Sequence, residues 1–274
     1  MRAKKIGIIG SSRGFGKSVY GFFAKKGFPI TGSYIGSPIT NKEVVEDSDV
    51  VIFAVPIGVT VQVIDEMLPY SREDQLWMDV TTYKVGAVNT MLKSSADVIG
   101  LHPLFGPTEA DTWRGQKIAV HMARVRAWSG WALDFLKATE ARVELVDPAV
   151  HDFYMLGAQG LPQLLNAFVQ AKVILALGFD TKQLLKLATR FSRKSFGLIG
   201  RILQQKNHRL YADIQIEHPG TAHMIKECIA ALREVQVMVD RKDQLGLISW
   251  IEELDKQLGP DFVAEAAKLF NENS

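Results

Sequence analysis

A histidine and a glycine-rich turn are the residues of this sequence best suited to chemistry. His102 lies in the segment Leu101-His102-Pro103-Leu104-Phe105-Gly106-Pro107, and the turn reads Gly10-Ser11-Ser12-Arg13-Gly14-Phe15-Gly16. Histidine exchanges a proton near neutral pH, because its ordinary pKa is about 6.5. Glycines let the main chain approach a phosphate closely, and the helix that follows such a turn offers free N–H groups. The sequence therefore offers a proton acceptor and a phosphate cradle.

Strands that end at one edge of a sheet would bring the turn and the histidine together. Short apolar runs alternate with helical patterns in the first half, which predicts a mostly parallel, doubly wound α/β sheet of the Rossmann type. The predicted helix after the turn spans residues 14–26. The predicted strands span residues 5–9, 29–34, 50–55, 75–80, 98–101, 117–121 and 142–146. His102 follows one of these strands, so we expect it at the carboxyl edge, where ligands bind.

The second half reads as helices only. Asp147 is a good N-cap and Pro148 a good first helical residue, so a helix should begin there. The predicted helices span residues 149–177, a segment capped by Asp180 or Thr181, residues 214–240 and 244–258, and a short terminal helix after Gly259-Pro260. We therefore predict a dinucleotide-binding domain over residues 1–146 and an all-helical domain over residues 147–274. The apolar helices of this second domain favour a homodimer.

Composition excludes several classes of protein. The chain has 274 residues, of which 47% are apolar and 23% charged, and its net charge of +2 is too small to indicate nucleic-acid binding. No apolar stretch reaches the ~18 residues of a membrane span, and the first predicted strand leaves no room for a signal peptide. The single cysteine, Cys228, excludes an internal disulfide and suits the cytoplasm. The six histidines lack metal-binding spacing, so we expect no metal site.

The glycine turn predicts a nicotinamide dinucleotide cofactor. Its glycines are spaced differently from Gly-x-Gly-x-x-Gly, but the turn follows a strand and opens a helix as that motif does. NAD-selective folds end the second strand with an acid that binds the ribose, and residues 31–35 contain none. Arg13 is suited to a 2′-phosphate, which favours NADP over NAD, although it is equally suited to a solvent-facing position. The other expected cofactor contacts are Ser33, Val55, Pro56 and Ile57.

The segment around His102 resembles the His-Pro-Met-Phe-Gly-Pro segment of prephenate dehydrogenases. Four other matches follow in the family's order, from the first strand to about Pro219. They are Val55-Pro56-Ile57-Gly58-Val59-Thr60, Asp79-Val80-Thr81-Thr82-Tyr83-Lys84, His151-Asp152 with Gln159-Gly160-Leu161, and Gly200-Arg201-Ile202 with Leu210-Tyr211-Ala212-Asp213-Ile214. The resemblance implies oxidative decarboxylation of prephenate to 4-hydroxyphenylpyruvate, with hydride transfer to NAD or NADP.

The resemblance also implies roles for individual residues. His102 would accept the proton of the substrate hydroxyl, and Thr82, where the family usually has serine, would bond that hydroxyl or His102. Arg201 would hold a substrate carboxylate through its guanidinium. Gln159 and Gln163 would contact the substrate, and Gln163 stands where the family commonly has histidine. That difference leaves arogenate dehydrogenase as an alternative.

Several residues keep less specific interpretations. Lys84 suits a structural role as well as a functional one, and Asp79 is expected to cap the turn that follows it. His151 at the helix start is expected to brace the junction of the two domains.

Three other functions compete with a prephenate or arogenate dehydrogenase. A β-hydroxyacid dehydrogenase would use a lysine of the helical domain, such as Lys172 or Lys182, but would leave the His102 segment unexplained. A short-chain dehydrogenase would need Tyr-x-x-x-Lys, which Tyr83-Lys84 does not supply. A non-catalytic binding module would use the basic residues between Arg190 and Arg209, although such a run usually forms a solvated helix face. We expect a small-molecule substrate and neither nucleic-acid nor membrane binding.

Overall fold

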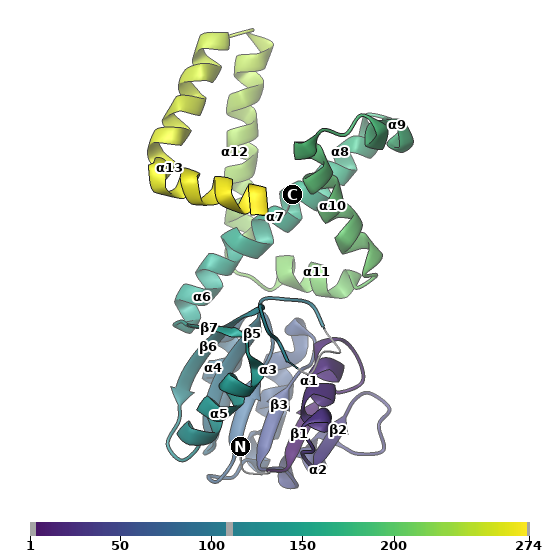
Figure 1. The fold of residues 1–274 in the computed structure, drawn as a ribbon, viewed down its shortest axis with the longest axis vertical. Coiled ribbons are helices and arrows are strands. Elements are labelled where there is room, and N and C mark those ends of the chain that lie inside the picture. The colour runs from purple at the N-terminus through teal and green to yellow at the C-terminus, as the bar shows by residue number, and fades with distance from the viewer. Residues whose placement is uncertain (1–3, 108–111, 273–274) are drawn as a thin grey trace. The chain divides into compact units, whose positions relative to one another are not determined.

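The computed structural model describes residues 4–107 and 112–272, and its first half is built on one sheet (Figure 1). The strand order is β2-β1-β3-β4-β5-β6-β7, and each neighbouring pair is parallel except β5 and β6. The strands are β1 Ile6–Ile9, β2 Ile30–Ser33, β3 Val50–Phe53, β4 Leu76–Asp79, β5 Asp97–Pro103, β6 Lys117–Arg124 and β7 Arg142–Leu145. The predicted mostly parallel sheet is confirmed.

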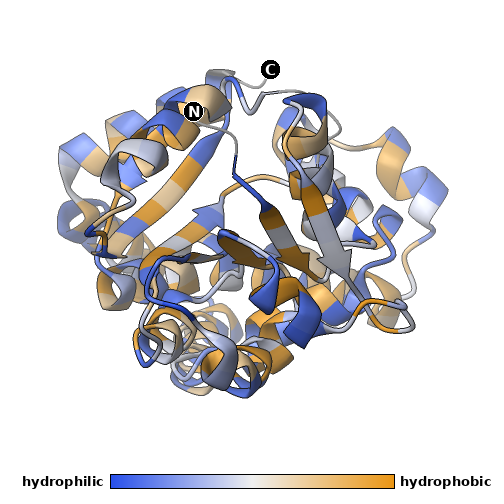
Figure 2. Cartoon of the chain, turned by 90° about the horizontal axis from the view of Figure 1, so that it is seen from below, coloured by the Kyte–Doolittle hydropathy of each residue, from blue (hydrophilic) through white to orange (hydrophobic). Residues whose placement is uncertain are grey.

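Helices cover both faces of the sheet, which confirms the doubly wound architecture. They are α1 Gly14–Lys25, α2 Asn41–Glu46, α3 Ile57–Met67, η1 Leu68–Tyr70, α4 Lys84–Met91 and α5 Ser129–Thr139. Successive strand residues point to opposite faces, and accordingly Ile8 belongs to the core cluster with α1 and α5, whereas Ile9 belongs to the cluster with α2, α3 and α4. Figure 2 shows the apolar residues concentrated on the central strands.

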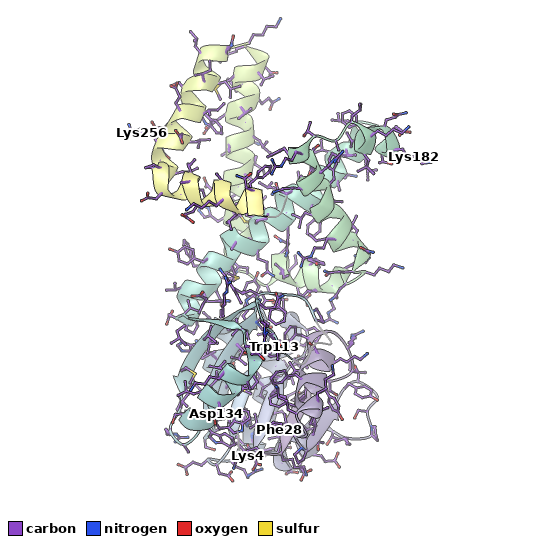
Figure 3. The ribbon with its side chains drawn as sticks, in the orientation of Figure 1. Lys4, Phe28, Trp113, Asp134, Lys182 and Lys256 are labelled. Carbon is purple, nitrogen blue, oxygen red and sulfur yellow. The ribbon has the colours of Figure 1, made fainter. Side chains whose placement is uncertain are left out.

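Three tryptophans of the first half belong to the core. Trp113, Trp128 and Trp131 are buried in the cluster on the α1 and α5 side of the sheet. Trp113 and Phe28, which packs against the same cluster, are labelled in Figure 3. Trp113 also lies 5.0 Å from Phe22 between ring centroids. These aromatic side chains thus contribute to the packing of this face of the sheet.

One strand differs from its predicted bounds in a way that affects the site. β5 continues through Pro103, so His102 lies inside the strand and not after it, and the prediction that it follows a strand ending at Leu101 was wrong. The cause is antiparallel pairing with β6, which joins His102 to Ala119 and Pro103 to Ile118 in the register. A sequence pattern does not reveal this partner, because β6 lies beyond the next loop.

The second half begins with a long helical run. The carboxylate of Asp147 accepts hydrogen bonds from the main-chain N–H groups of Ala149 and Val150, which confirms the predicted N-cap. The run consists of α6 Pro148–Met155, η2 Leu156–Gly160, α7 Leu161–Gln163, η3 Leu164–Val169 and α8 Gln170–Ala176, in which η2 and η3 are π-helical. Pro162 lies between the two π segments, and a proline removes a main-chain donor from the helix ladder.

The remaining helices are α9 Thr181–Lys186, α10 Arg190–Gln204, α11 His208–Ile216, α12 Thr221–Asp240 and α13 Gln244–Glu272. Asp180 caps α9 through the N–H of Gln183, as predicted. The continuous helix predicted over residues 214–240 was wrong, because the chain leaves the helix between α11 and α12. Pro219 explains the break, since proline disfavours a helical conformation in the residue before it. Gly259, with φ +77°, confirms the predicted break at Gly259-Pro260.

The chain divides into two compact units, residues 1–219 and 220–274. The boundary at residues 146 and 147 stays a prediction. Across the part of the chain that the structure describes, no helix has both the length and the apolar character needed to cross a membrane.

Candidate active site

The glycine turn between β1 and α1 leaves no room for larger side chains. Gly10 has φ +94°, and a Cβ on Gly16 would lie only 2.0 Å from the carbonyl oxygen of Gly10. The main-chain N–H groups of Gly10 and Ser11 donate to the carbonyl oxygen of Ser33, at 2.8 and 3.0 Å. The turn is therefore held against the end of β2 in a conformation that only glycine permits at Gly10 and Gly16.

This turn has the features of a phosphate cradle. Arg13 is the N-cap of α1, no side chain caps the helix, and its first turn contains no acid. The N-terminus of α1 thus keeps its partial positive charge and free N–H donors, which fit the pyrophosphate of a dinucleotide. Ser12 and Arg13 are exposed beside it.

The other predicted cofactor contacts lie at neighbouring strand ends. Val55 and Ile57 are half-buried and Pro56 is exposed at the start of α3, next to the turn after β3. Ser33 is buried, and its hydroxyl donates to Oδ1 of Asn41 at 2.7 Å. The contribution of Ser33 that the structure displays is thus to hold the glycine turn through its carbonyl oxygen.

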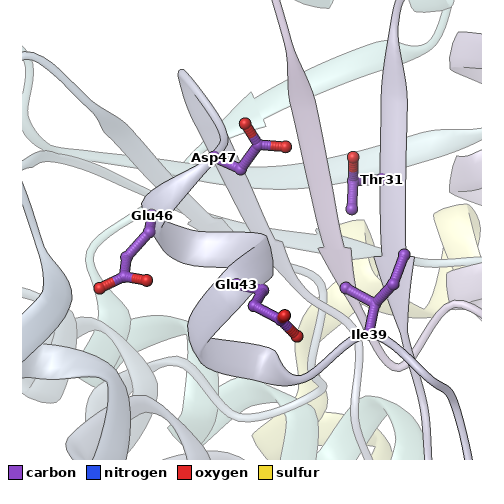
Figure 4. Close-up of a pocket in the computed structure, with 5 residues that line it drawn as sticks. All are labelled: Thr31, Ile39, Glu43, Glu46 and Asp47. Atoms are coloured by element: carbon purple, nitrogen blue, oxygen red, sulfur yellow. The ribbon is translucent and has the colours of Figure 1, made fainter.

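A cavity of about 490 Å³ lies beside β2 and α2 (Figure 4). It is lined by Thr31, Ile39, Glu43, Glu46 and Asp47. Three carboxylates would repel the phosphates of a dinucleotide, so this cavity does not suit the cofactor. Among the residues that the structure describes, no group of three His, Cys, Asp or Glu side chains is arranged to hold a metal ion.

His102 lies in a hydrogen-bonded chain with the first helix of the second half. Its Nδ1 is 3.0 Å from Nε2 of His151 on α6, and the two rings are inclined at 81°. Nδ1 of His151 is in turn 2.8 Å from Oδ1 of Asp152. Both histidines are buried. His151 therefore does more than brace a junction, because it contacts the predicted base directly.

Asp152 also caps a helix of the sheet domain. Its Oδ1 accepts the main-chain N–H of Lys84 at 2.8 Å, and its Oδ2 accepts that of Val85 at 2.9 Å. Burial alone would raise the pKa of Asp152, but the hydrogen bonds from His151, Lys84 and Val85 lower it below its ordinary value. Asp152 is therefore an ionised acceptor that joins the start of α4 to the histidine chain.

The environment of His102 keeps its imidazole neutral. Burial lowers the pKa of His102 well below 6.5, and the positive charge of Lys84 and the neighbouring His151 lower it further. A histidine with a lowered pKa is unprotonated at neutral pH, which is the form that accepts a proton. The ring of His102 is thus buried and unprotonated, as a general base must be before it accepts a proton.

Lys84 and Asp79 form a buried ion pair behind this base. The ammonium of Lys84 donates to the Asp79 carboxylate and to the carbonyl oxygen of Leu101 in β5, the latter at 2.6 Å. Burial raises the pKa of Asp79 and lowers that of Lys84, while their mutual attraction opposes both shifts. Asp79 also accepts the N–H of Thr81 at 3.0 Å, which confirms its predicted turn cap. Lys84 therefore supports the strand that carries His102.

Thr82 and the expected substrate-binding residues have fewer contacts. Thr82 is buried in the turn before α4, and its hydroxyl has no hydrogen-bond partner among the described residues. Arg201 is exposed in the last turn of α10, near Tyr211. Oε1 of Gln159 and Oε1 of Gln163 are each buried without a partner in the described part of the chain. No described hydrogen bond joins these four residues to His102.

The structure also bears on the lysines of the β-hydroxyacid alternative. Lys172 and Lys182 are exposed on α8 and α9, and Lys182 is labelled in Figure 3. Neither belongs to the chain of hydrogen bonds around His102. The contact between His102 and His151 was not predicted from the sequence. The sequence feature that could have indicated it is the His151-Asp152 pair at the start of a helix.

Two family models match the sequence in succession. The nucleotide-binding domain of prephenate dehydrogenase matches residues 11–121, and the dimerization domain of prephenate dehydrogenase matches residues 147–253. The chain is 33% identical over 276 residues to a probable arogenate/prephenate dehydrogenase of Methanocaldococcus jannaschii, a match that covers 93% of this chain and 61% of that relative. It is 26% identical to the T-protein of Haemophilus influenzae, over 98% of this chain and 71% of that protein.

Solved structures share the fold. A prephenate dehydrogenase from Aquifex aeolicus, crystallised with hydroxyphenyl propionate and NAD+, has a TM-score of 0.68 and 18% identity, and the match covers 93% of this chain and 96% of that one. An arogenate dehydrogenase from Synechocystis has a TM-score of 0.59 and 15% identity, over 91% of this chain and 96% of that one. At these identities the likeness concerns the fold alone.

Proposed function

Because the chain belongs to the prephenate dehydrogenase family, we propose that it converts prephenate to 4-hydroxyphenylpyruvate by oxidative decarboxylation, with hydride transfer to NAD or NADP. The observation that carries this proposal is the buried, neutral His102, whose Nδ1 side is engaged by His151. Nε2 is therefore the ring nitrogen of His102 that can face a substrate.

The chemistry assigned to this site is proton abstraction. His102 accepts the proton of the ring hydroxyl through Nε2 while hydride leaves the same carbon, and loss of the ring carboxylate as CO2 then makes the ring aromatic. A nicotinamide dinucleotide bound in the glycine cradle would supply the hydride acceptor. General-base catalysis of this kind contributes a factor of about 10²–10⁴ to the rate. The Thr82 hydroxyl, which has no partner among the described residues, would orient the substrate hydroxyl.

NADP is the cofactor that the residues favour. Residues 31–35 contain no acid to bind a ribose 2′-hydroxyl, and Arg13 is exposed beside the glycine turn. A guanidinium there would pair with a 2′-phosphate.

Arg201, Gln159 and Gln163 are assigned to the rest of the substrate. Arg201 would bind a carboxylate in a bidentate manner. Arogenate is the second candidate substrate, because the buried amide oxygens of Gln159 and Gln163 are acceptors without donors. Arogenate carries an ammonium where prephenate carries a keto oxygen, and an ammonium only donates hydrogen bonds. We further propose that the active form is a homodimer assembled through the helical part, which the match to a dimerization domain supports.

Absorbance of the reduced nicotinamide tests this function. Purified protein is assayed with prephenate and arogenate, each with NAD and NADP, beside His102→Asn. We expect turnover with prephenate and NADP that falls about 10²–10⁴-fold in the variant. His121→Asn is the matched control, because the described side-chain hydrogen bond of His121 joins its Nδ1 to the carbonyl oxygen of Val146, at 3.1 Å, away from His102. Absence of turnover in all four combinations would overturn the proposal.

A further inference from the structure

We propose that His151 and Asp152 are positioning residues that fix the tautomer of His102 and then take over the positive charge of the abstracted proton. The use of this relay in catalysis rests on the proposed function, whereas the tautomer itself is a property of the protein alone.

The carboxylate of Asp152 fixes the proton of His151. An ionised carboxylate only accepts hydrogen bonds, and this one already accepts two main-chain N–H groups, those of Lys84 and Val85. Nδ1 of His151, 2.8 Å from Oδ1 of Asp152, must therefore carry a proton and donate it. In a neutral imidazole the other nitrogen then has a lone pair, so Nε2 of His151 is an acceptor.

The same reasoning fixes the proton of His102. Its Nδ1 lies 3.0 Å from the accepting Nε2 of His151, so it must be the donor. Nε2 of His102 then carries the lone pair. If the chain ran in the opposite direction, Nε2 of His102 would carry a proton and the base would be lost. Asp152 thus determines, through His151, that His102 is able to accept a proton.

The charges around the chain favour moving the proton away from His102. On the side of His102, α4 contributes the ammonium of Lys84, which is paired with Asp79 of β4. On the side of His151, α6 contributes the carboxylate of Asp152. When Nε2 of His102 gains the substrate proton, its Nδ1–H bond breaks and an Nε2–H bond forms on His151. His102 is neutral again, and the imidazolium of His151 lies against a carboxylate, where opposite charges attract.

Further groups hold Asp152 in place from other elements. Nε2 of His218, after α11, is 2.9 Å from the main-chain oxygen of Asp152, and its ring lies 5.1 Å from the ring of Tyr83. Burial raises the pKa of Tyr83, and the charges of Asp152 and Glu217 raise it further, so Tyr83 stays neutral. The carboxylate of Asp152 is the anion that α6 contributes to the relay, and it also caps α4. The packing of α6 against α4 therefore places the carboxylate that fixes the proton of His151.

Histidine ¹⁵N NMR of the protein without ligands tests the tautomer directly. The chain has six histidines, and His102→Asn and His151→Asn identify the two signals. We expect the proton on Nδ1 in both rings. In Asp152→Ala the acceptor that holds the proton on Nδ1 of His151 is removed, so signals of rings protonated on Nε2 should appear. A wild-type His102 protonated on Nε2, or an Asp152→Ala variant with unchanged tautomers, would overturn the inference.

Kinetics tests the use of the relay. Asp152→Ala should lower kcat by about 10²–10⁴-fold with little change in KM, because His102 is no longer held in the tautomer that accepts a proton. The wrong tautomer has an effect of this size in the serine protease triad. Asp152→Glu keeps a carboxylate and should restore at least a tenth of the wild-type kcat. Asp147→Asn is the matched control, because the Asp147 carboxylate caps the same helix and no described hydrogen bond joins that carboxylate to a histidine ring. Its kcat should stay within about twofold.

The two readouts separate the possible failures. If the NMR tautomers are as expected and no substrate is turned over, the proposed function fails while the hydrogen-bond chain stands. If the wild type turns over prephenate and Asp152→Ala keeps its full kcat, the relay has no catalytic role. Circular dichroism of each variant identifies a loss of folding, and Asp152→Glu then carries the test, because it retains the cap of α4.

Discussion

The surroundings of His102 keep its imidazole ring unprotonated. Burial and the ammonium of Lys84 both oppose protonation of its ring. Lys84 itself is held by Asp79 and by the carbonyl oxygen of Leu101, in the same strand as His102. A buried pair of this kind contributes little net stability. The effect of this ion pair is electrostatic, because it holds the positive charge of Lys84 next to the ring of His102.

The lowered pKa of His102 predicts the acid limb of the pH–rate profile. Because the unprotonated ring is the active form, kcat/KM should be constant from pH 8 down to about 6.5 and fall only as pH drops through the lowered pKa. The measurement is kcat/KM against pH at constant ionic strength, with His121→Asn as control. An acid limb centred at or above pH 6.5 would contradict this account of the site.

At the scale of elements, the start of α1 shows why the cofactor site needs glycine. Gly16 and Gly21 belong to the same helix, but their surroundings differ. A Cβ at Gly16 would meet the carbonyl oxygen of Gly10 at 2.0 Å, whereas nothing lies within 4 Å of a Cβ at Gly21. The first position is constrained by the turn between β1 and α1, which is the proposed phosphate cradle, and the second only by the helix.

These two glycines make a matched pair of variants. Gly16→Ala should displace the turn and weaken NADP binding at least tenfold, since the clash involves main chain and has no rotamer to relieve it. Gly21→Ala should leave the Kd for NADP unchanged and stabilise the protein by about 0.5–1 kcal/mol, the usual gain of alanine over glycine in a helix. Fluorescence titration measures the first quantity and urea unfolding the second. Equal NADP affinity in both variants would exclude the turn as the cradle.

Most strands and helices were predictable from the sequence, and the exceptions have physical reasons. All seven strands were located to within a few residues, because buried parallel strands are short apolar runs between turns. The end of β5 was missed because antiparallel pairing with β6 extends it past His102. The break at Pro219 was missed because apolar spacing continues across it. The contact of His102 with His151 spans 49 positions, and no local pattern encodes such a distance.

At the scale of the molecule, helices α12 and α13 expose many apolar side chains to solvent. Within the unit of residues 220–274, Leu232 is 60% exposed, Val239 59% and Leu245 79%. Isolated exposed leucines are common, but a helical hairpin with this many is typical of a surface that another chain covers. A second copy of the chain is the partner that the dimerization-domain match favours.

A charge in this hairpin should therefore dissociate the dimer. Sedimentation equilibrium of the wild type should give twice the chain mass of 30.4 kDa, and Leu232→Glu should shift the population toward 30.4 kDa at micromolar concentration. The reason is that an unpaired carboxylate is costly to bury in an apolar interface. Leu133→Glu is the control, because Leu133 is also about half exposed but lies on α5, outside the helical part. A wild type that sediments as a monomer would remove the dimer from the proposal and leave the His102 proposal standing, because the hydrogen bonds that join His102, His151 and Asp152 are made within one chain.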